Sequence, residues 1–224
     1  MSSYVYMKVL ESTPQRYDRG IRFLSRGAID AVYQRLAELV AEPGNRVLDV
    51  GCGTGNVAIA CTARGADAVG IDLNAGMLEV ARAKTVTASG GAGEIEWMKL
   101  GALEIEDRFP PDTFDGAASC LLFSELTEDE QGYLLATLAS RVRSGGMVAI
   151  ADEVAPNGAA ARAWWRLLRL PRVAATWLLA QTSTRPVSGL EQKMRDVGFR
   201  DIQVERMAGN FVVIHGEVST RGAL

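Results

Sequence analysis

Cysteine, histidine and long apolar runs are scarce in this sequence. Its 224 residues include three cysteines, Cys52, Cys61 and Cys120, none of them in a CxxC pair, and one histidine, His215. These are too few for a disulfide framework or a closed zinc site, so we expect reduced thiols and no metal. No stretch reaches the ~18 apolar residues of a membrane span, and residues 1–10 lack the apolar run of a signal peptide, so we expect a cytoplasmic protein.

An excess of positive charge is also missing. The chain has 24 Lys and Arg against 27 Asp and Glu, which gives a net charge of -3. A dedicated nucleic-acid-binding protein carries a basic field over much of its surface, so we expect no nucleic-acid partner. A hydrophobic content of 48% at this length allows a single domain with a sizeable core.

Apolar runs alternate between strand-like and helix-like patterns from residue 46 onward. This order favours a Rossmann-like, doubly wound α/β fold with a mostly parallel sheet of seven strands. Its last two strands are only four residues apart, too few for a parallel crossover, so we expect a C-terminal antiparallel hairpin. The expected strands are 46–50, 68–71, 94–100, 114–120, 147–151, 202–206 and 211–215, and the expected helices are 56–63, 75–84, 128–142 and 190–197.

A glycine-rich stretch, DVGCGTG from Asp49 to Gly55, follows the first expected strand, and Asp72 ends the second. An acid at that interval is typical of a carboxylate that binds ribose hydroxyls. The glycine spacing differs from the G-x-G-x-x-G of dinucleotide folds, and the GK[ST] of a phosphate loop is absent. The ligand that fits is a nucleoside without phosphates, S-adenosylmethionine.

These motifs, in this order, resemble those of class I S-adenosylmethionine-dependent methyltransferases. The likeness covers about residues 46–152 and rests on Asp49 to Gly55, Gly70-Ile71-Asp72, Met77-Leu78, Phe114-Asp115 and Gly145-Gly146. It implies a methyltransferase whose cofactor is S-adenosylmethionine. It also implies that Asp72 accepts both ribose hydroxyls and that Leu73 and Met77 flank the adenine. The other cofactor-binding residues that we expect are Tyr17, Asp49, Gly51, Cys52, Gly53, Thr54, Gly55, Gly101, Ala102 and Cys120.

The chain departs from that family after its third expected strand. Where the family carries an acid that meets the adenine amino group, this sequence reads Leu100-Gly101-Ala102-Leu103. The backbone at Gly101 or Ala102, or the side chain of Glu104, is left as the candidate for that contact.

A second resemblance spans nearly the whole chain. The segments MKVLES, RYDRGI, FSEL, ADEV and QTSTRPV, which begin at residues 7, 16, 123, 151 and 181, are similar to those of the corrinoid protein-associated methyltransferases. This likeness implies a corrinoid-linked pathway in which a corrinoid protein is a partner. Tyr17, in RYDRGI, is then either an aromatic lid over the cofactor or a core residue.

Three acids follow the fourth and fifth expected strands, at the sheet edge where a substrate would lie. Glu125, Asp152 and Glu153 are the catalytic candidates because they alone at that edge can accept a proton. Their alternative role is to cap a helix or to pair with an arginine. An acceptor that is already nucleophilic would need no base at all.

The stretch Ala163 to Val187 holds three of the four tryptophans, and no acid occurs between Glu153 and Glu191. On a helix its arginines would form a basic stripe opposite Trp164 and neighbouring leucines. We expect a helical cap at 154–189 that covers the substrate. The basic helix of this cap, at 162–172, is expected to meet a corrinoid protein or a membrane surface. A simple solvated helix face is the alternative.

The expected organisation is a single methyltransferase domain over residues 1–224. An N-terminal helical lid segment, 1–45, precedes the cofactor-binding core at 46–153, and the cap is followed by a C-terminal helix and hairpin at 190–224. The expected function is methyl transfer to a small hydrophobic or protein-held acceptor. Its alternatives are a membrane-associated quinone or lipid methyltransferase and a non-catalytic sensor of S-adenosylmethionine.

Overall fold

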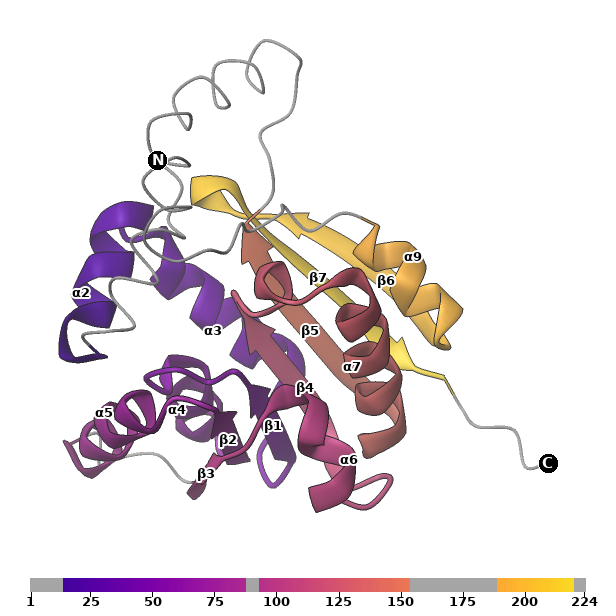
Figure 1. Cartoon of the computed structure of the whole chain (residues 1–224), viewed down its shortest axis with the longest axis horizontal. Coiled ribbons are helices and arrows are strands. Elements are labelled where there is room, and N and C mark those ends of the chain that lie inside the picture. The colour runs from indigo at the N-terminus through magenta and orange to yellow at the C-terminus, as the bar shows by residue number, and fades with distance from the viewer. Residues whose placement is uncertain (1–13, 88–92, 154–188, 220–224) are drawn as a thin grey trace, which may run out of the picture.

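One seven-stranded sheet forms the centre of the structure (Figure 1), a computed structural model that describes residues 14–87, 93–153 and 189–219. The strand order is β3-β2-β1-β4-β5-β7-β6. The first five strands pair in parallel, whereas β7 runs antiparallel to both β5 and β6. The predicted α/β fold, with a mostly parallel sheet and a C-terminal antiparallel hairpin, is therefore confirmed. The predicted cap lies outside the described residues, as does its basic helix at 162–172.

The strands are β1 Arg46–Val50, β2 Asp67–Asp72, β3 Ile95–Lys99, β4 Phe114–Cys120, β5 Val142–Glu153, β6 Phe199–Arg206 and β7 Phe211–Val218. The α-helices are α2 Pro14–Ser25, α3 Ala28–Val40, α4 Asn56–Ala63, α5 Ala75–Thr87, α6 Ile105–Arg108, α7 Glu128–Arg141 and α9 Leu190–Asp196. Three short 3-10 helices are η1 Ala102–Glu104, η2 Phe123–Glu125 and η3 Ala208–Asn210.

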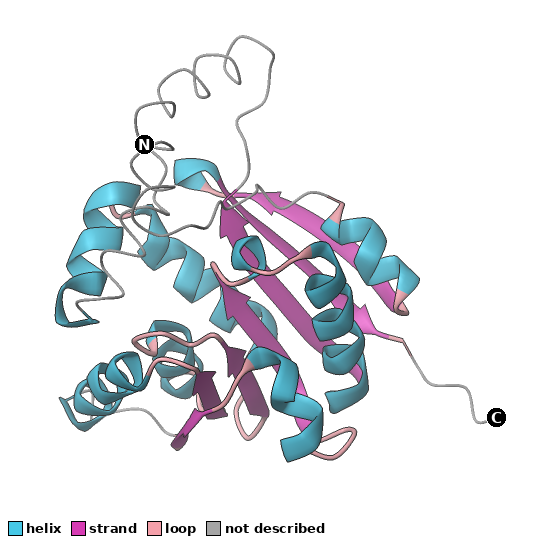
Figure 2. Ribbon diagram, in the orientation of Figure 1, coloured by secondary structure: helices cyan, strands magenta, loops and turns pink. Residues whose placement is uncertain are grey.

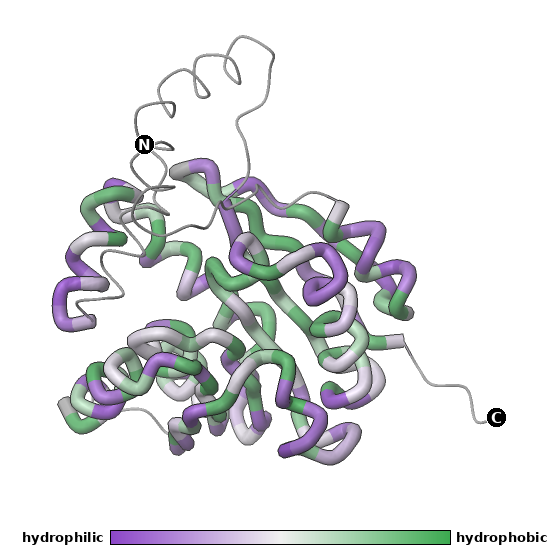
Figure 3. The backbone as a smooth tube through the Cα atoms, viewed as in Figure 1, coloured by the Kyte–Doolittle hydropathy of each residue, from purple (hydrophilic) through white to green (hydrophobic). Residues whose placement is uncertain are grey.

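Helices cover both faces of the sheet (Figure 2). Side chains of α2, α3 and α4 pack on one face, and those of α6, α7 and α9 pack on the other. Successive residues of a strand point to opposite faces, so Val47 joins the first core and Leu48 the second. The central strands are rich in apolar residues for this reason, and Figure 3 shows hydrophobic residues along the strands in the middle of the molecule.

Strand β5 is longer than predicted at its start. The strand was expected over residues 147–151, but β5 begins at Val142, which pairs with Phe114 before the register moves to Met147 opposite Gly116. The glycines therefore lie in an irregular part of the strand rather than before it. A Cβ on Gly146 would lie 2.4 Å from the carbonyl oxygen of Asp115, so glycine permits this close approach of two backbones.

The strand order reverses between β1 and β4, which are neighbours in the sheet but separated in sequence by β2 and β3. Connections leave the carboxyl ends of these two strands in opposite directions, and this opens a crevice where α/β folds bind their ligands. The functional site is therefore expected at the ends of β1, β2 and β4. Among the described residues, no helix combines the length and the hydrophobicity that crossing a bilayer requires.

Candidate functional site

A cleft of about 620 Å³ opens at the carboxyl ends of β1, β2 and β4. It brings together nine of the predicted cofactor-binding residues: Tyr17, Gly51, Gly53, Asp72, Leu73, Met77, Gly101, Ala102 and Cys120. Further lining residues are Asn74, Leu100, Leu103, Glu104, Leu121, Leu122, Glu125, Leu126 and Glu130. The sequence motifs thus converge on one cavity, and most of the additional lining is apolar.

The glycine loop adopts a backbone that favours glycine. Gly51, Gly53 and Gly55 have φ values of +67°, +52° and +82°, in the left-handed region where other L-residues are strained. A Cβ on Gly53 would meet no atom within 4 Å, so its Cα faces open space in the cleft. Gly55 lies at the N-cap of α4 and is not among the described residues that line the cleft.

Asp72 fastens the end of β2 to the glycine loop. Its Oδ2 accepts a hydrogen bond from the Gly53 N–H at 2.8 Å, and its Oδ1 accepts one from the Asn74 N–H at 2.7 Å. A carboxylate has about four acceptor positions, so hydroxyl groups of a ligand can be added. Leu73 follows with 67% of its surface exposed, and Met77 lies a turn further on at the cleft.

The segment after β3 is held by its own carboxylate. Glu104 Oε2 accepts a hydrogen bond from the Gly101 N–H at 2.8 Å, so that N–H is already used. Glu104 therefore shapes the loop that lines the cleft. The adenine amino group is a donor and needs an acceptor, so the backbone at Gly101 or Ala102 and the side chain of Glu104 all stay predictions for that contact.

A second cavity of about 30 Å³ adjoins the cleft and shares Tyr17 and Gly51 with it. Asp49, Cys52 and Thr54 line this smaller cavity, which has room for one water molecule or one ammonium group. Asp49 Oδ2 accepts a hydrogen bond from the Ala58 N–H at 3.0 Å, whereas Oδ1 is buried without a hydrogen-bond partner among the described residues.

Complete burial raises the pKa of Asp49 to about 7. The cost of a buried charge causes this rise, because a desolvated carboxylate with an unused oxygen favours its neutral form. Burial also raises the pKa of the Cys52 and Cys120 thiols well above their ordinary value. Both sulfurs are therefore neutral near pH 7, which argues for packing and against nucleophilic roles.

The three predicted catalytic acids lie in different surroundings. Glu125, on η2, is exposed and lines the cleft. Asp152 is 4% exposed, and its carboxylate accepts hydrogen bonds from the Ser124 N–H and the Glu153 N–H, both at 2.8 Å. Burial raises its pKa to about 6. Neither Asp152 nor Glu153 is among the described lining residues, so the structure brings only Glu125 to the cleft.

The hydrogen bonds of Asp152 hold η2 in place. A second anchor comes from α7, where Gln131 Nε2 donates to the Phe123 carbonyl oxygen at 2.8 Å. Asp152 thus acts on the site through the backbone that carries Glu125. Glu130, also in the lining, accepts hydrogen bonds from Thr127, which lower its pKa and cap α7.

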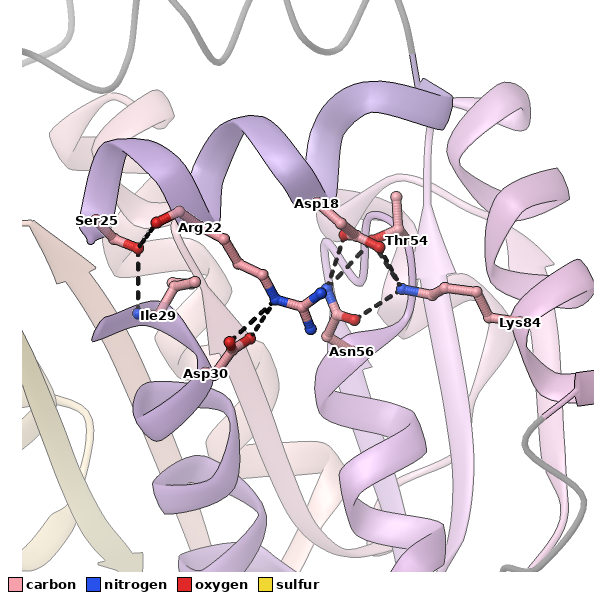
Figure 4. Close-up of polar contacts among 8 residues, drawn as sticks. All are labelled: Asp18, Arg22, Ser25, Ile29, Asp30, Thr54, Asn56 and Lys84. Carbon is pink, nitrogen blue, oxygen red and sulfur yellow. Dashed lines mark hydrogen bonds and ion pairs between the residues drawn. The ribbon is translucent and has the colours of Figure 1, made fainter. Parts of the chain in front are cut away.

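An unpredicted polar network ties α2 to the glycine loop (Figure 4). Asp18 Oδ1 accepts hydrogen bonds from Thr54 Oγ1 at 2.6 Å and Asn56 Nδ2 at 3.0 Å, and Asp18 Oδ2 lies 2.9 Å from Lys84 Nζ. Burial alone would raise the pKa of Asp18, but these hydrogen bonds outweigh it and hold the pKa below its ordinary value. The network holds Tyr17, the residue before Asp18, at the edge of the cleft.

Trp97 supports the glycine loop from β3 and was not singled out in the sequence. It pairs in register with Gly70 on β2, and its Nε1 donates to Thr85 Oγ1 at 3.2 Å. A Cβ on Gly55 would lie 2.3 Å from the Trp97 ring, and one on Gly70 would lie 2.4 Å from it. Gly70, inside a strand, was the available signal, since glycine there often marks a close approach.

Comparisons with known proteins agree with this geometry. The sequence profile of a methyltransferase domain matches residues 47–146. The ubiquinone/menaquinone biosynthesis C-methyltransferase of Geotalea daltonii is 32% identical over an alignment of 155 positions, which covers 67% of this chain and 63% of that protein. The demethylmenaquinone methyltransferase of Clavibacter sepedonicus is 23% identical over an alignment of 229 positions, which covers 96% of this chain and 90% of that protein.

Matches to three curated relatives span only 63%, 62% and 66% of the relatives' lengths. Among solved structures, magnesium protoporphyrin IX methyltransferase from Synechocystis PCC 6803 with bound S-adenosylhomocysteine has a TM-score of 0.65 at 16% identity. That match covers 89% of this chain and 87% of the other, and at such identity it shows the fold. Taken with the domain match and the cleft, these findings show that the chain carries an S-adenosylmethionine-dependent methyltransferase domain with the class I fold.

Proposed function

We propose that the chain transfers a methyl group from S-adenosylmethionine to a small hydrophobic acceptor of the quinol or phenol class. The observation that carries this proposal is the lining of the cleft beyond the glycine loop. Leu121, Leu122 and Leu126 form an apolar wall there, and the exposed carboxylate of Glu125 stands beside it. Relatives named for ubiquinone and menaquinone biosynthesis support the same acceptor class.

The residues of the cleft fit the cofactor at three points. Asp72 would accept the ribose hydroxyls, and the open space at Gly53 admits a ligand against the backbone. The buried Asp49 Oδ1, which has no hydrogen-bond partner among the described residues, fits the methionine ammonium group in the 30 Å³ cavity. Tyr17, at the edge of both cavities, would close over the bound molecule.

S-adenosylmethionine supplies a methyl group on a sulfonium sulfur, which leaves as a neutral thioether with the electron pair of the broken bond. The protein has to align the acceptor with that methyl and keep water away. Glu125 would accept the proton that a phenol oxygen or a quinol ring carbon loses as its new bond to carbon forms. Asp152 would hold Glu125 in position through η2.

A transfer assay with methyl-labelled S-adenosylmethionine tests this proposal. The acceptors are a short-chain naphthoquinol, a simple phenol and a buffer blank. We expect label in the naphthoquinol or phenol product and none in the blank. Cofactor binding without transfer to either acceptor would contradict the proposal and favour a sensor.

Other sequence-based expectations stay predictions. None of the relatives reported above is named for a corrinoid protein, so the corrinoid-linked pathway rests on the sequence resemblance alone. The basic helix at 162–172, which was expected to contact a protein or a membrane, lies outside the described residues. A protein-held acceptor likewise remains an alternative to a free small molecule.

Replacing Asp72 by Ala should lower the affinity for S-adenosylmethionine at least tenfold. The change removes a charge-assisted acceptor of two hydroxyls, worth about 1.5–3 kcal/mol, and releases the Gly53 N–H. Calorimetry measures the affinity. Asp67→Ala is the matched control, because Asp67 begins the same strand and also accepts one backbone hydrogen bond. An unchanged affinity in folded Asp72→Ala protein would overturn the ribose assignment.

Replacing Asp49 by Asn should stabilise the cofactor-free protein above pH 7. The pKa of Asp49 rises from an ordinary 3.8 to about 7 on folding. Between these values the folded state binds more protons than the unfolded state, so stability falls as pH rises through this window. The penalty, on the order of 4 kcal/mol for a rise of about three pKa units, is complete above pH 7 and absent below pH 4.

Urea unfolding of wild type and Asp49→Asn at pH 5 and pH 8 measures this effect. We expect the stability advantage of the variant to grow between the two values. The same variant should bind S-adenosylmethionine more weakly at pH 8, because it lacks the charge that faces the ammonium. A difference in stability that does not change with pH would show that Asp49 does not titrate in this range.

A further inference from the structure

Helix α2 presents a basic and aromatic face to solvent. Arg16, Arg19 and Phe23 recur at intervals of three and four residues, which places them on one side of the helix, and Arg26 is the first residue after the helix. All four are exposed, and Phe23 keeps 82% of its surface open to solvent. The face therefore combines one large exposed aromatic side chain with three exposed arginines.

The charge of this face is unbalanced although the whole chain has a net charge of -3. Arg22, at the edge of the face, is held by Asp30 at 2.8 Å. For Arg16, Arg19 and Arg26 no ion pair is found with any part of the chain that the structure describes. These three guanidinium groups are therefore available to an anionic partner.

We propose that the face formed by Arg16, Arg19, Phe23 and Arg26 docks on the surface of an anionic phospholipid bilayer. Guanidinium groups pair with lipid phosphates, and a phenyl ring enters the boundary between headgroups and acyl chains. Three arginines near an anionic leaflet raise partitioning by on the order of 100-fold.

The opposite side of α2 is built into the site. Tyr17 lines the cleft, Ile21 is fully buried, and Asp18 is tied to Lys84 and the glycine loop (Figure 4). Because this network fixes the orientation of the helix, the outward direction of its arginines is fixed too. A bilayer on that face would lie about one helix diameter, ~10 Å, from the cleft. The purpose of the contact rests on the proposed function, since a hydrophobic quinol or phenol dissolves in the bilayer.

A flat lipid surface fits this face better than an acidic protein. The face is the convex side of a single helix, and an exposed phenyl ring on it needs an apolar layer rather than a carboxylate. A bilayer supplies phosphates and hydrocarbon at the depths where the arginines and the ring would lie.

Cosedimentation of the full chain with vesicles tests the proposal. One vesicle type is phosphatidylcholine alone and the other contains 30% phosphatidylglycerol. We expect binding to the anionic vesicles that weakens with added salt. The triple variant R16E/R19E/R26E should lose at least about 30-fold in partitioning, and Phe23→Ser about five- to tenfold.

The matched control is R64E/R108E/R200E, which changes the net charge equally at exposed positions outside α2. It should keep most of the binding. Calorimetry with S-adenosylhomocysteine shows whether each variant is folded, and R16Q/R19Q/R26Q replaces the charge reversal if that variant is not. Wild-type protein that does not bind anionic vesicles would overturn the proposal and favour an acidic protein partner. An equal loss of vesicle binding in the control variant would overturn it too.

A soluble short-chain naphthoquinol separates this proposal from the proposed function. Turnover of that acceptor without vesicle binding would overturn the membrane contact and leave the function standing. Vesicle binding that depends on α2, without any turnover, would sustain the contact and overturn the function.

Discussion

Replacing Glu125 by Gln should lower kcat about 100-fold or more and leave the affinity for S-adenosylmethionine unchanged. A positioned general base contributes about this factor, and the amide keeps the shape of the side chain while losing its ability to accept a proton. Glu125 is the exposed carboxylate of η2 at the apolar wall of the cleft. Steady-state rates with the naphthoquinol or phenol acceptor measure the effect.

Glu128→Gln is the control for this experiment, because Glu128 is an exposed acid three residues further on and is not among the described lining residues. It should keep its activity. Asp152→Asn should lower kcat less than Glu125→Gln does, since Asp152 acts through the backbone of η2. A Glu125→Gln enzyme with kcat within a few fold of wild type would mean that the acceptor arrives already ionised and that alignment alone carries the reaction.

Replacing Gly55 by Ala should destabilise the protein by about 3 kcal/mol or more. A residue other than glycine costs about 1–2 kcal/mol in the left-handed backbone that Gly55 adopts at φ +82°. Its Cβ would also lie 2.3 Å from the Trp97 ring, which has to move against Gly70 or out of the site. Overpacking of this kind adds about 1–3 kcal/mol. Urea unfolding measures the loss.

Gly53→Ala gives the matched comparison. Gly53 also has a positive φ of +52°, but its Cβ would meet no atom within 4 Å. This variant should lose only the backbone cost in stability, while its methyl group would project into the cofactor space and weaken binding. Trp97→Leu should restore part of the stability of Gly55→Ala. Equal destabilisation of the two glycine variants would contradict the role assigned to Trp97.

The parts of the fold that were predictable are those with local signals. Apolar runs marked each strand of the sheet, and the four-residue gap before Phe211 revealed the antiparallel hairpin. The glycine loop and Asp72 could be found for the same reason, because a positive φ and a carboxylate at a strand end leave a mark on the sequence. Their convergence on one cleft then follows from the parallel sheet.

The parts that were missed depend on contacts between distant residues. Asp18 meets Thr54 and Lys84 only after three elements have packed, and no spacing along the chain announces that network. Asp152 was placed at the correct sheet edge, but sequence does not reveal whether such a side chain points to the cleft or toward η2. Strand β5 begins earlier than expected because Val142 pairs with Phe114, a contact between distant residues, while Gly145 keeps a positive φ of +78° in the irregular stretch before Met147.

A crystal structure of the chain with S-adenosylhomocysteine tests the central claim most directly. The ribose hydroxyls should lie within hydrogen-bond distance of the Asp72 carboxylate, the adenine beside Leu73 and Met77, and the ammonium group at Asp49. The thioether sulfur should face the apolar wall that carries Glu125. A nucleoside bound elsewhere, or bound in this cleft with its ribose away from Asp72, would contradict the account.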